Sequence, residues 1–412
     1  MEWIFELMGE KAAANEGNKW LIISAHTVVS VLAFIICICC AVALGYTKTT
    51  PSPPTGSIYR DYEALQGNRK SLQDYCNTHN IKIDEAPMVS FNVATANFGG
   101  IFTETQTLMN PWTGSVNAAA VRLQVEGGAR AVVFDIWPDP VDSAKPVICA
   151  MTDHREFWYA RWWRSNGLAR GTSNFSNWRL QTRNTLPVGE VLQTAVTAAF
   201  DSTPGTQNTD PFFMILNLHG AMTVPYLNRL GSTVETALQG YGMASQYANA
   251  GQQDKLCNAP VSHFMNRVFV IVVPDTNDAF YSLPGISNGP KFVEALKQTK
   301  MGQVMNAVQD GTHQIAFEPG SLAQVQKPSQ PNCASAGGAL LTPAQAGFCL
   351  VQPSIGGATT DNATAYANTS WTACQQAGAQ FVAVNMFDSN STDAVMSQFY
   401  DARNFDTYSF RR

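Results

Sequence analysis

The feature that most constrains this chain is the run from Trp20 to Tyr46, which contains no formal charge. At about 1.5 Å per helical residue, such a run is long enough to cross a hydrocarbon core of about 30 Å. A cleaved signal peptide would have an apolar core of roughly 7–15 residues, and here a polar tail, residues 1–19, precedes the run. The run is also apolar on every face, which does not fit a helix of a soluble core. We therefore predict an uncleaved signal-anchor helix over 20–46, with the lipid bilayer as its partner.

The orientation of this anchor is not set by its flanking charges. Lys11 and Lys19 precede it and Lys48 and Arg60 follow it, so the positive-inside rule gives no answer. N-glycosylation sequons in the downstream body favour a lumenal or exterior location, and a location inside a membrane-containing virion is kept as an alternative. These sequons begin at Asn174, Asn362, Asn368 and Asn390.

Composition excludes one class of function and favours another. The charged share is 14% of 412 residues and the net charge is −5, against a typical charged share of about 25%. The sequence has no block of lysine or arginine, so nucleic acid is not an expected partner. A surface poor in charge suits a protein packed among other subunits, and protein partners are therefore expected.

Cysteine usage fits an exterior body. Of nine cysteines, Cys37, Cys39 and Cys40 lie in the predicted span, as palmitoylation sites or as small apolar residues. The other six permit up to three disulfides, and Cys333 and Cys349 are the first candidate pair. No CxxC pair occurs in the body, which argues against a structural zinc site.

The rest of the chain reads as an anchored α/β body. A proline-rich linker covers 47–57, a polar helical lead-in covers 58–84, and 85–412 alternates apolar runs with helical patterns. The apolar runs are 88–95, 129–137, 145–151, 211–219, 267–275, 313–318 and 380–388. Strands that are apolar on both faces and alternate with helices indicate a parallel sheet covered on both sides. We predict a (β/α)₈ TIM-type barrel over 85–412.

At residues 115–137 the chain resembles the X region of phosphatidylinositol-specific phospholipase C, in the family of PLC-like phosphodiesterases. Gly128-Ala129-Arg130 matches the turn that ends a helix in that family, and Phe134-Asp135-Ile136-Trp137 matches the acidic end of the following strand. Segments similar to further family motifs occur in the family's order, at 90–95, 145–152, 198–220 and 380–412. The resemblance covers most of 85–412 and implies a PLC-like barrel.

The resemblance also implies what the chemistry requires. In this family one histidine deprotonates the inositol hydroxyl, a second protonates the leaving alkoxide, and Ca²⁺ or an arginine stabilises the charge on phosphorus. In this sequence the family's two histidines fall on Phe91 and Ala150. The family's acidic residue two positions before Asp135 falls on Val133, and the arginine that replaces calcium in bacterial enzymes falls on Trp137.

Two residues of the family's calcium site are kept in this alignment, Asn92 and Asp135, while the fourth-strand glutamate falls on His219. Two oxygen ligands are too few for Ca²⁺, which takes about six to eight. Phenylalanine and alanine transfer no protons. The sequence therefore predicts a pseudoenzyme without a cofactor, which serves as a binding or structural subunit, for example in the shell of a virus that encloses a lipid layer.

Two alternatives stay open. His154, His219 and Asp135 form a possible acid/base set for an active phosphodiesterase on glycerophospholipid, GPI or phosphoinositide substrates, with Ca²⁺ as its possible cofactor. The ordinary interpretation is that His154 begins a helix and His219 caps a strand. A lectin-like or inositol-phosphate-binding module, which keeps a pocket without the chemistry, is the third class.

Overall fold

A computed structural model describes part of the chain in enough detail for analysis. The residues described are 28–33, 35, 71–103, 114–139, 142–153, 178–180, 182, 184–200, 208–219, 223–243, 259–274, 296–308, 315–316, 348–351, 374, 379–386 and 408–410. The chain divides into two compact units, Met1–Thr50 and Pro51–Arg412.

In the first unit, residues 28–33 and 35 are helical. The large apolar side chains there are about half exposed, from 45% at Val29 to 56% at Val28. Within the ranges given above, no helix is both long and apolar enough to span a bilayer. The rest of the predicted span, 20–27, 34 and 36–46, lies outside the described residues, so the span itself stays a prediction.

The second unit is built on a row of eight parallel strands, in the order β11-β10-β9-β4-β1-β14-β13-β12. These are β1 (Phe91–Ala96), β4 (Ala131–Pro138), β9 (Phe212–Leu218), β10 (Val268–Pro274), β11 (Ala307–Val308), β12 (Ile315–Ala316), β13 (Leu350–Val351) and β14 (Phe381–Val384). Parallel order follows from the sequence, because long crossovers, several of them helical, separate consecutive strands.

Shorter elements complete the sheet and its borders. They are β2 (Ile101–Thr103), β3 (Gly114–Val116), β5 (Pro146–Ile148), β6 (Met151–Asp153), β7 (Trp178–Leu180), β8 (Leu186–Pro187) and β15 (Tyr408–Phe410). β15 pairs antiparallel with β1, β5 pairs antiparallel with β4 and β8, and β2–β3 and β6–β7 form separate two-stranded sheets.

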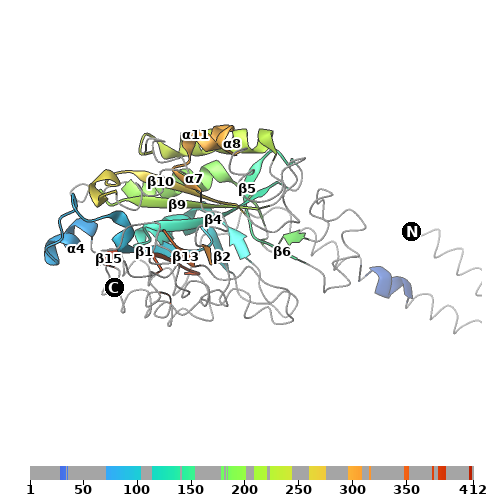
Figure 1. Ribbon diagram of the computed structural model, residues 1–412. Coiled ribbons are helices and arrows are strands. Elements are labelled where there is room, and N and C mark those ends of the chain that lie inside the picture. The colour runs from blue at the N-terminus through green and yellow to red at the C-terminus, as the bar shows by residue number, and fades with distance from the viewer. Residues whose placement is uncertain are drawn as a thin grey trace, which may run out of the picture. The chain divides into compact units, whose positions relative to one another are not determined.

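Helices cover the outer face of strands β1, β4, β9 and β10. They are α5 (Ala118–Glu126), α7 (Val188–Phe200), α8 (Val224–Leu238) and α11 (Lys300–Val304). Figure 1 shows α7, α8 and α11 stacked over β4, β9 and β10. The buried residues of α7 recur at 188, 191, 192, 195, 196 and 199, the three-and-four spacing that turns one helical face to the sheet.

The other face of the sheet encloses an aromatic core. Phe213 lies 5.1 Å from Phe381 between ring centroids, and Phe348 lies 6.0 Å from Phe269 and 6.1 Å from Phe381. Phe269 belongs to β10, and Phe348 lies two residues before β13. Rings from strands that are far apart in the row therefore meet. The sheet is therefore strongly curved, with this cluster inside. Each fully buried phenylalanine contributes roughly 1.5–3 kcal/mol.

A short helix closes the N-terminal ends of the strands. α4 (Leu72–Thr78) begins at a capping box made by Ser71 and Asp74, and its Leu72 amide donates to both carboxylate oxygens of Asp210, at 3.0 and 3.1 Å. The 3₁₀ turns η2 (Met88–Ser90) and η6 (Val261–His263) lie at the same end. Figure 1 shows α4 at the opposite end of the sheet from β5.

The structure bears out the α/β class and changes two details of the prediction. The run 145–151, predicted as a barrel strand, contains β5, which forms an antiparallel hairpin with β4 and does not enter the parallel row. β11 and β13 were not predicted, because each contributes only two residues to the sheet. The row is open among the described strands, since no pairing of β11 with β12 occurs there.

Candidate functional site

Polar side chains follow the inner-face residues at the C-terminal ends of four strands. On β1, Phe91 and Val93 belong to the inner core while Ala94 and Ala96 belong to the outer core, and the same alternation holds on β4, β9 and β14. Continuing it places polar residues on the inner face at each strand's end. We call this set the polar layer; it consists of Asn97, Asp135, Asn217, His219 and Asn385. All five are buried, with 1–5% of each residue exposed.

Asp135 is the centre of the polar layer. It lies directly across from Asn217 in the register of β4 and β9. Its Oδ1 accepts a hydrogen bond from Asn217 Nδ2 at 2.8 Å and lies 2.9 Å from His219 Nε2. Because a carboxylate only accepts, this geometry places the proton of the imidazole on Nε2.

His219 is fixed on a second side by Trp137. The two rings stack with centroids 4.4 Å apart and an interplanar angle of 11°. The His219 side chain is 7% exposed, and its backbone amide donates to the carbonyl of Ile136 at 2.9 Å. The ring is therefore held by stacking, by the carboxylate and by its own backbone, and it is largely withdrawn from solvent.

The polar layer includes buried side-chain atoms that have no hydrogen-bond partner in the part of the chain that the structure describes. Among them are Asp135 Oδ2, Asn217 Oδ1 and Asn97 Nδ2. An unsatisfied buried polar atom costs roughly 1–3 kcal/mol, so each such atom in a folded protein calls for an explanation.

The structure corrects the assignment of the first strand. Phe91 and Asn92 lie at the N-terminal end of β1, where Phe91 pairs with β15 and contacts Tyr75 of α4. Asn92 also lies on the opposite face of the strand from Phe91. It is therefore not brought together with Asp135, and Asn97 is the asparagine at the C-terminal end of β1.

The other positions predicted as lost family residues are apolar core. Val133 belongs to the inner core and is 0% exposed, and Ala150 belongs to the outer core and is 2% exposed. Ala150 follows β5, which is a hairpin strand. Trp137 instead contributes its indole to the stack on His219.

Several predicted residues lie outside the described part of the chain. His154, the sequons at Asn174, Asn362, Asn368 and Asn390, and Cys333 are among them. The proposed Cys333–Cys349 bond therefore stays a prediction, as does any role of His154.

Three described cysteines are free thiols, namely Cys76, Cys149 and Cys374. Burial raises the pKa of Cys76 and of Cys374 to about 11, and Asp210 adds to the effect at Cys76. Burial raises the pKa of Cys149 above its ordinary value, helped by the charges of Asp135 and Asp139. None of these thiols is an activated nucleophile, which requires a lowered pKa.

A metal ion finds few ligands here. Within the described residues, no group of three or more His, Cys, Asp or Glu side chains could hold one. Asp135 is the one carboxylate of the polar layer, and the amides beside it supply single oxygens. These oxygens amount to only about half of the six to eight that Ca²⁺ takes.

The arrangement thus offers one buried carboxylate–imidazole pair and a set of amides. Sequence reasoning found Asp135, Trp137 and His219 but missed Asn97, Asn217 and Asn385. A signal for them exists, because each stands two residues after an inward-facing residue of a strand in a strict alternation.

Comparison of the chain with known proteins finds similar solved structures and no matching family model. No protein-family model matches it, and no curated protein gives a significant match. Among solved structures, PLC21 of L. pealei matches at 11% identity and a TM-score of 0.45, over 80% of this chain and 38% of that one. This chain thus spans well under half the length of PLC21.

Two bacterial structures also match. The calcium-dependent phosphoinositol-specific phospholipase C of a Pseudomonas species has 11% identity and a TM-score of 0.37, covering 74% of this chain and 93% of that one. The Ca²⁺-dependent enzyme of Streptomyces antibioticus has 10% identity and a TM-score of 0.37, covering 76% and 97%. The structures that the chain is similar to are thus phospholipases C of the kind that its motifs resemble, at TM-scores below 0.5.

Proposed function

We propose that the PLC-like body is a binding or structural subunit that does not cleave phosphodiesters by the two-histidine route. The observation that carries this proposal is the state of His219. Its ring is stacked on Trp137, bonded to Asp135 and 7% exposed. A general acid or base has to reach the proton it transfers, about 2.6–3.2 Å away.

The position of the second family histidine supports the same conclusion. It falls on Ala150, which is packed in the outer core and cannot transfer a proton. Among the described histidines, His79 lies beyond α4 and His263 lies in η6, both at the N-terminal ends of the strands. The described residues therefore supply one imidazole at the C-terminal end, where chemistry in this class of fold is located.

A turnover assay tests the proposal. The full chain, in mixed micelles, is incubated with phosphatidylinositol and with glycerophosphodiesters, in Ca²⁺ or in EDTA. We expect no turnover above that of the Asp135→Asn and His219→Gln variants. Turnover that both substitutions abolish, in variants that remain folded, would refute the pseudoenzyme.

The alternative is an active phosphodiesterase, and one observation favours it. His219 Nε2 and Asp135 Oδ1 are 2.9 Å apart at strand ends, which is hydrogen-bonding geometry for a base oriented by a carboxylate. The second acid/base group would come from beyond the described residues, with His154 as the candidate and Ca²⁺ as a possible addition. Loss of turnover on His154→Ala would establish this function.

We also propose that the eight-stranded row closes into a barrel. Its two end strands, β11 and β12, follow each other in sequence, and the inner core already joins strands distant in the row. Cysteines placed singly in 307–308 and in 315–316 should crosslink on mild oxidation. Failure of every such pair would contradict closure.

Membrane anchoring through residues 20–46 is the remaining part of the proposal. The uncharged run supports it, and so do the apolar side chains that helix residues 28–33 and 35 leave exposed. The body would then lie in a lumen, outside the cell or inside a membrane-containing virion, among other protein subunits. Protease protection and glycosidase treatment of the membrane-bound chain test the location of the body.

A further inference from the structure

Two buried cysteines lie next to the strands β13 and β14. Cys349 directly precedes β13, and Cys374 is a helical residue shortly before β14. Both residues are 0% exposed, and both belong to the outer core together with Val351 of β13. Leu350, between Cys349 and Val351, turns instead to the inner core, as alternation along a strand requires. The two cysteine side chains are therefore packed on the same face of the sheet.

Backbone hydrogen bonds bring the two cysteines to the same short piece of chain. The Phe381 amide donates to the Cys349 carbonyl at 2.9 Å, and the Ala379 amide donates to the Cys374 carbonyl at 3.0 Å. Two residues of chain span at most about 7 Å, so both cysteines lie against one segment, 379–381. A disulfide needs Cα atoms about 4.4–6.8 Å apart, which is a separation of the same order.

We propose that Cys349 and Cys374 form a disulfide bond that ties β13 to the approach of β14 on the outer face. The bond joins strands that are short, because β13 contributes two residues to the sheet and β14 four. Closing the segment between the two cysteines removes conformations from the unfolded chain and so stabilises the fold. This assignment gives Cys349 a different partner from Cys333, and it does not depend on whether the body is catalytic.

The oxidant in this reaction is a small-molecule disulfide, glutathione disulfide. The thiolate of one cysteine attacks a sulfur of glutathione disulfide, forms a mixed disulfide and releases one glutathione thiolate. The second cysteine thiolate attacks the protein sulfur of the mixed disulfide and releases the other glutathione thiolate. Each released thiolate takes up a proton that a cysteine has lost. Two protein thiols and one glutathione disulfide thus give one protein disulfide and two glutathione thiols.

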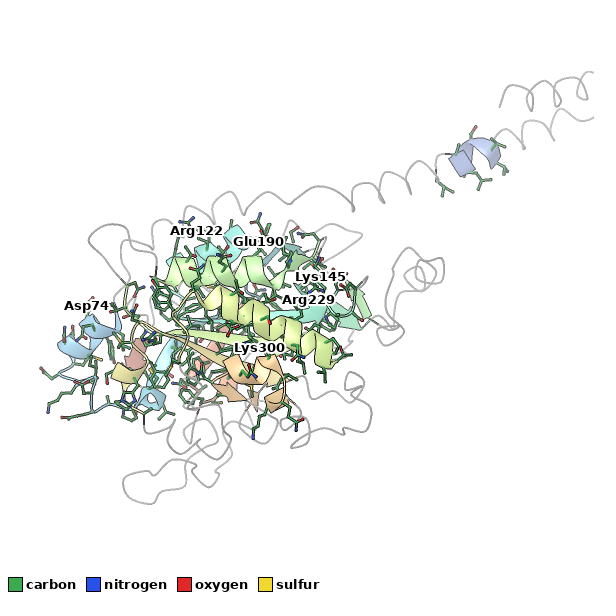
Figure 2. The ribbon with its side chains drawn as sticks, turned by 90° about the horizontal axis from the view of Figure 1, so that it is seen from above. Asp74, Arg122, Lys145, Glu190, Arg229 and Lys300 are labelled. Carbon is green, nitrogen blue, oxygen red and sulfur yellow. The ribbon has the colours of Figure 1, made fainter. Side chains whose placement is uncertain are left out.

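Burial decides when this reaction occurs. It raises the pKa of the Cys374 thiol to about 11, so little of that thiol is ionised in the folded, reduced chain. The cations labelled in Figure 2 lie on other elements, namely α5, the turn before β5, α8 and α11; they are Arg122, Lys145, Arg229 and Lys300. The bond therefore forms during folding, before the cysteines are covered. Burial then protects it from attack by reducing thiols.

A disulfide map of the full chain tests the proposal. The chain is made by cell-free synthesis in detergent micelles with reduced and oxidised glutathione, so the body meets the oxidant whatever the orientation of the anchor. Thiols are blocked with N-ethylmaleimide during denaturation, and the digest is analysed by mass spectrometry without reduction. We expect one peptide pair that joins Cys349 to Cys374, lighter than the two free peptides by two hydrogen atoms. Cys76 and Cys149 should carry the maleimide.

Cys76 and Cys149 are matched controls within the same chain. Burial raises the pKa of both thiols as well, but Cys76 lies on α4 at the N-terminal ends of the strands and Cys149 follows β5 at the opposite end. Cys333→Ser should leave the Cys349–Cys374 pair intact. Dithiothreitol should lower the urea midpoint of the natural chain more than that of Cys374→Ser, which lacks the bond.

The other outcomes overturn the proposal. A peptide pair that joins Cys349 to Cys333 would show that Cys333 is the partner. Maleimide on both Cys349 and Cys374, in a chain that unfolds cooperatively, would show that both are thiols of the outer core. If the Cys349–Cys374 pair forms equally well when the chain is oxidised in urea, closeness in sequence explains it and the packing on β13 and β14 does not.

Discussion

The interaction between Asp135 and His219 is the sharpest test of whether this site is structural or catalytic. Asp135→Ala leaves the donors of Asn217 and His219 buried, and each unpaired donor costs roughly 1–3 kcal/mol. His219→Ala removes a charge-assisted bond and a stack, worth about 1.5–3 and about 0.5–1.5 kcal/mol. Summed, these terms predict a destabilisation of about 2–6 kcal/mol for Asp135→Ala and of about 2–4.5 kcal/mol for His219→Ala.

The double substitution measures the interaction itself. Removing both partners should cost less than the sum of the two single changes, by about 1.5–3 kcal/mol, because the second change no longer breaks the bond. The assay is urea unfolding of the full chain followed by circular dichroism, with midpoints compared at a common slope. Thr95→Val is the control, since within the described residues its hydroxyl donates only to the Val93 carbonyl of its own strand, at 2.8 Å.

The opposite outcome has a clear meaning. Groups kept for catalysis commonly lower stability, so replacing them is neutral or stabilising. If Asp135→Ala and His219→Ala leave the free energy of unfolding unchanged or raise it, the structural interpretation is refuted. A coupling below about 0.5 kcal/mol would show that the two residues act independently.

Three further outcomes concern packing, pH and the membrane. Gly231→Ala places a methyl 2.3 Å from the Met301 amide nitrogen of α11, so it should lower the free energy of unfolding by about 1–3 kcal/mol in thermal unfolding. Gly189→Ala is the control and should not lower it, because the nearest atom to the added methyl is the Thr233 methyl, at 3.1 Å. Cys76 and Cys374 have pKa values of about 11 in the fold against about 8.5 in the unfolded chain, so stability present below about pH 9 should fall as the pH rises toward 11. Cys76→Ala should reduce that alkaline loss, and an unchanged pH profile would contradict the burial argument. Leu32→Lys should release the chain from membranes at alkaline carbonate extraction, while continued retention would argue against a span through residue 32.

The positions of the main strands could be read from the sequence because they are long and apolar on both faces. Strands β4, β9 and β10 fall within the predicted runs 129–137, 211–219 and 267–275 to within a residue. The run 145–151 was misread because its composition is that of a buried strand, and composition does not distinguish a hairpin partner from a parallel neighbour. Only the antiparallel register of Trp137 with Val147 does so.

Only part of the polar layer could be predicted from the sequence, for a different reason. Asp135 and His219 were found through a motif. Motif matching also put the first-strand asparagine at Asn92, where the residue type matches the motif but the position lies at the wrong end of the strand. Chemistry in a parallel sheet gathers where strands end, and β1 ends at Ala96, so the alternation of inner-face residues leads to Asn97. Which atoms of that asparagine stay unpaired depends on contacts from other strands, and no local pattern contains them.

Trp137 shows that the ends of the strands and the core beneath them are held together by different contacts. The aromatic core beneath it joins β9, β10, β14 and the approach to β13 through Phe213, Phe269, Phe381 and Phe348, and none of these contacts involves the polar layer. The strands are therefore held together whatever residues occupy their ends. The Trp137 indole covers one face of the His219 imidazole, so the ends of β4 and β9 are joined by a ring contact of their own that is separate from this core.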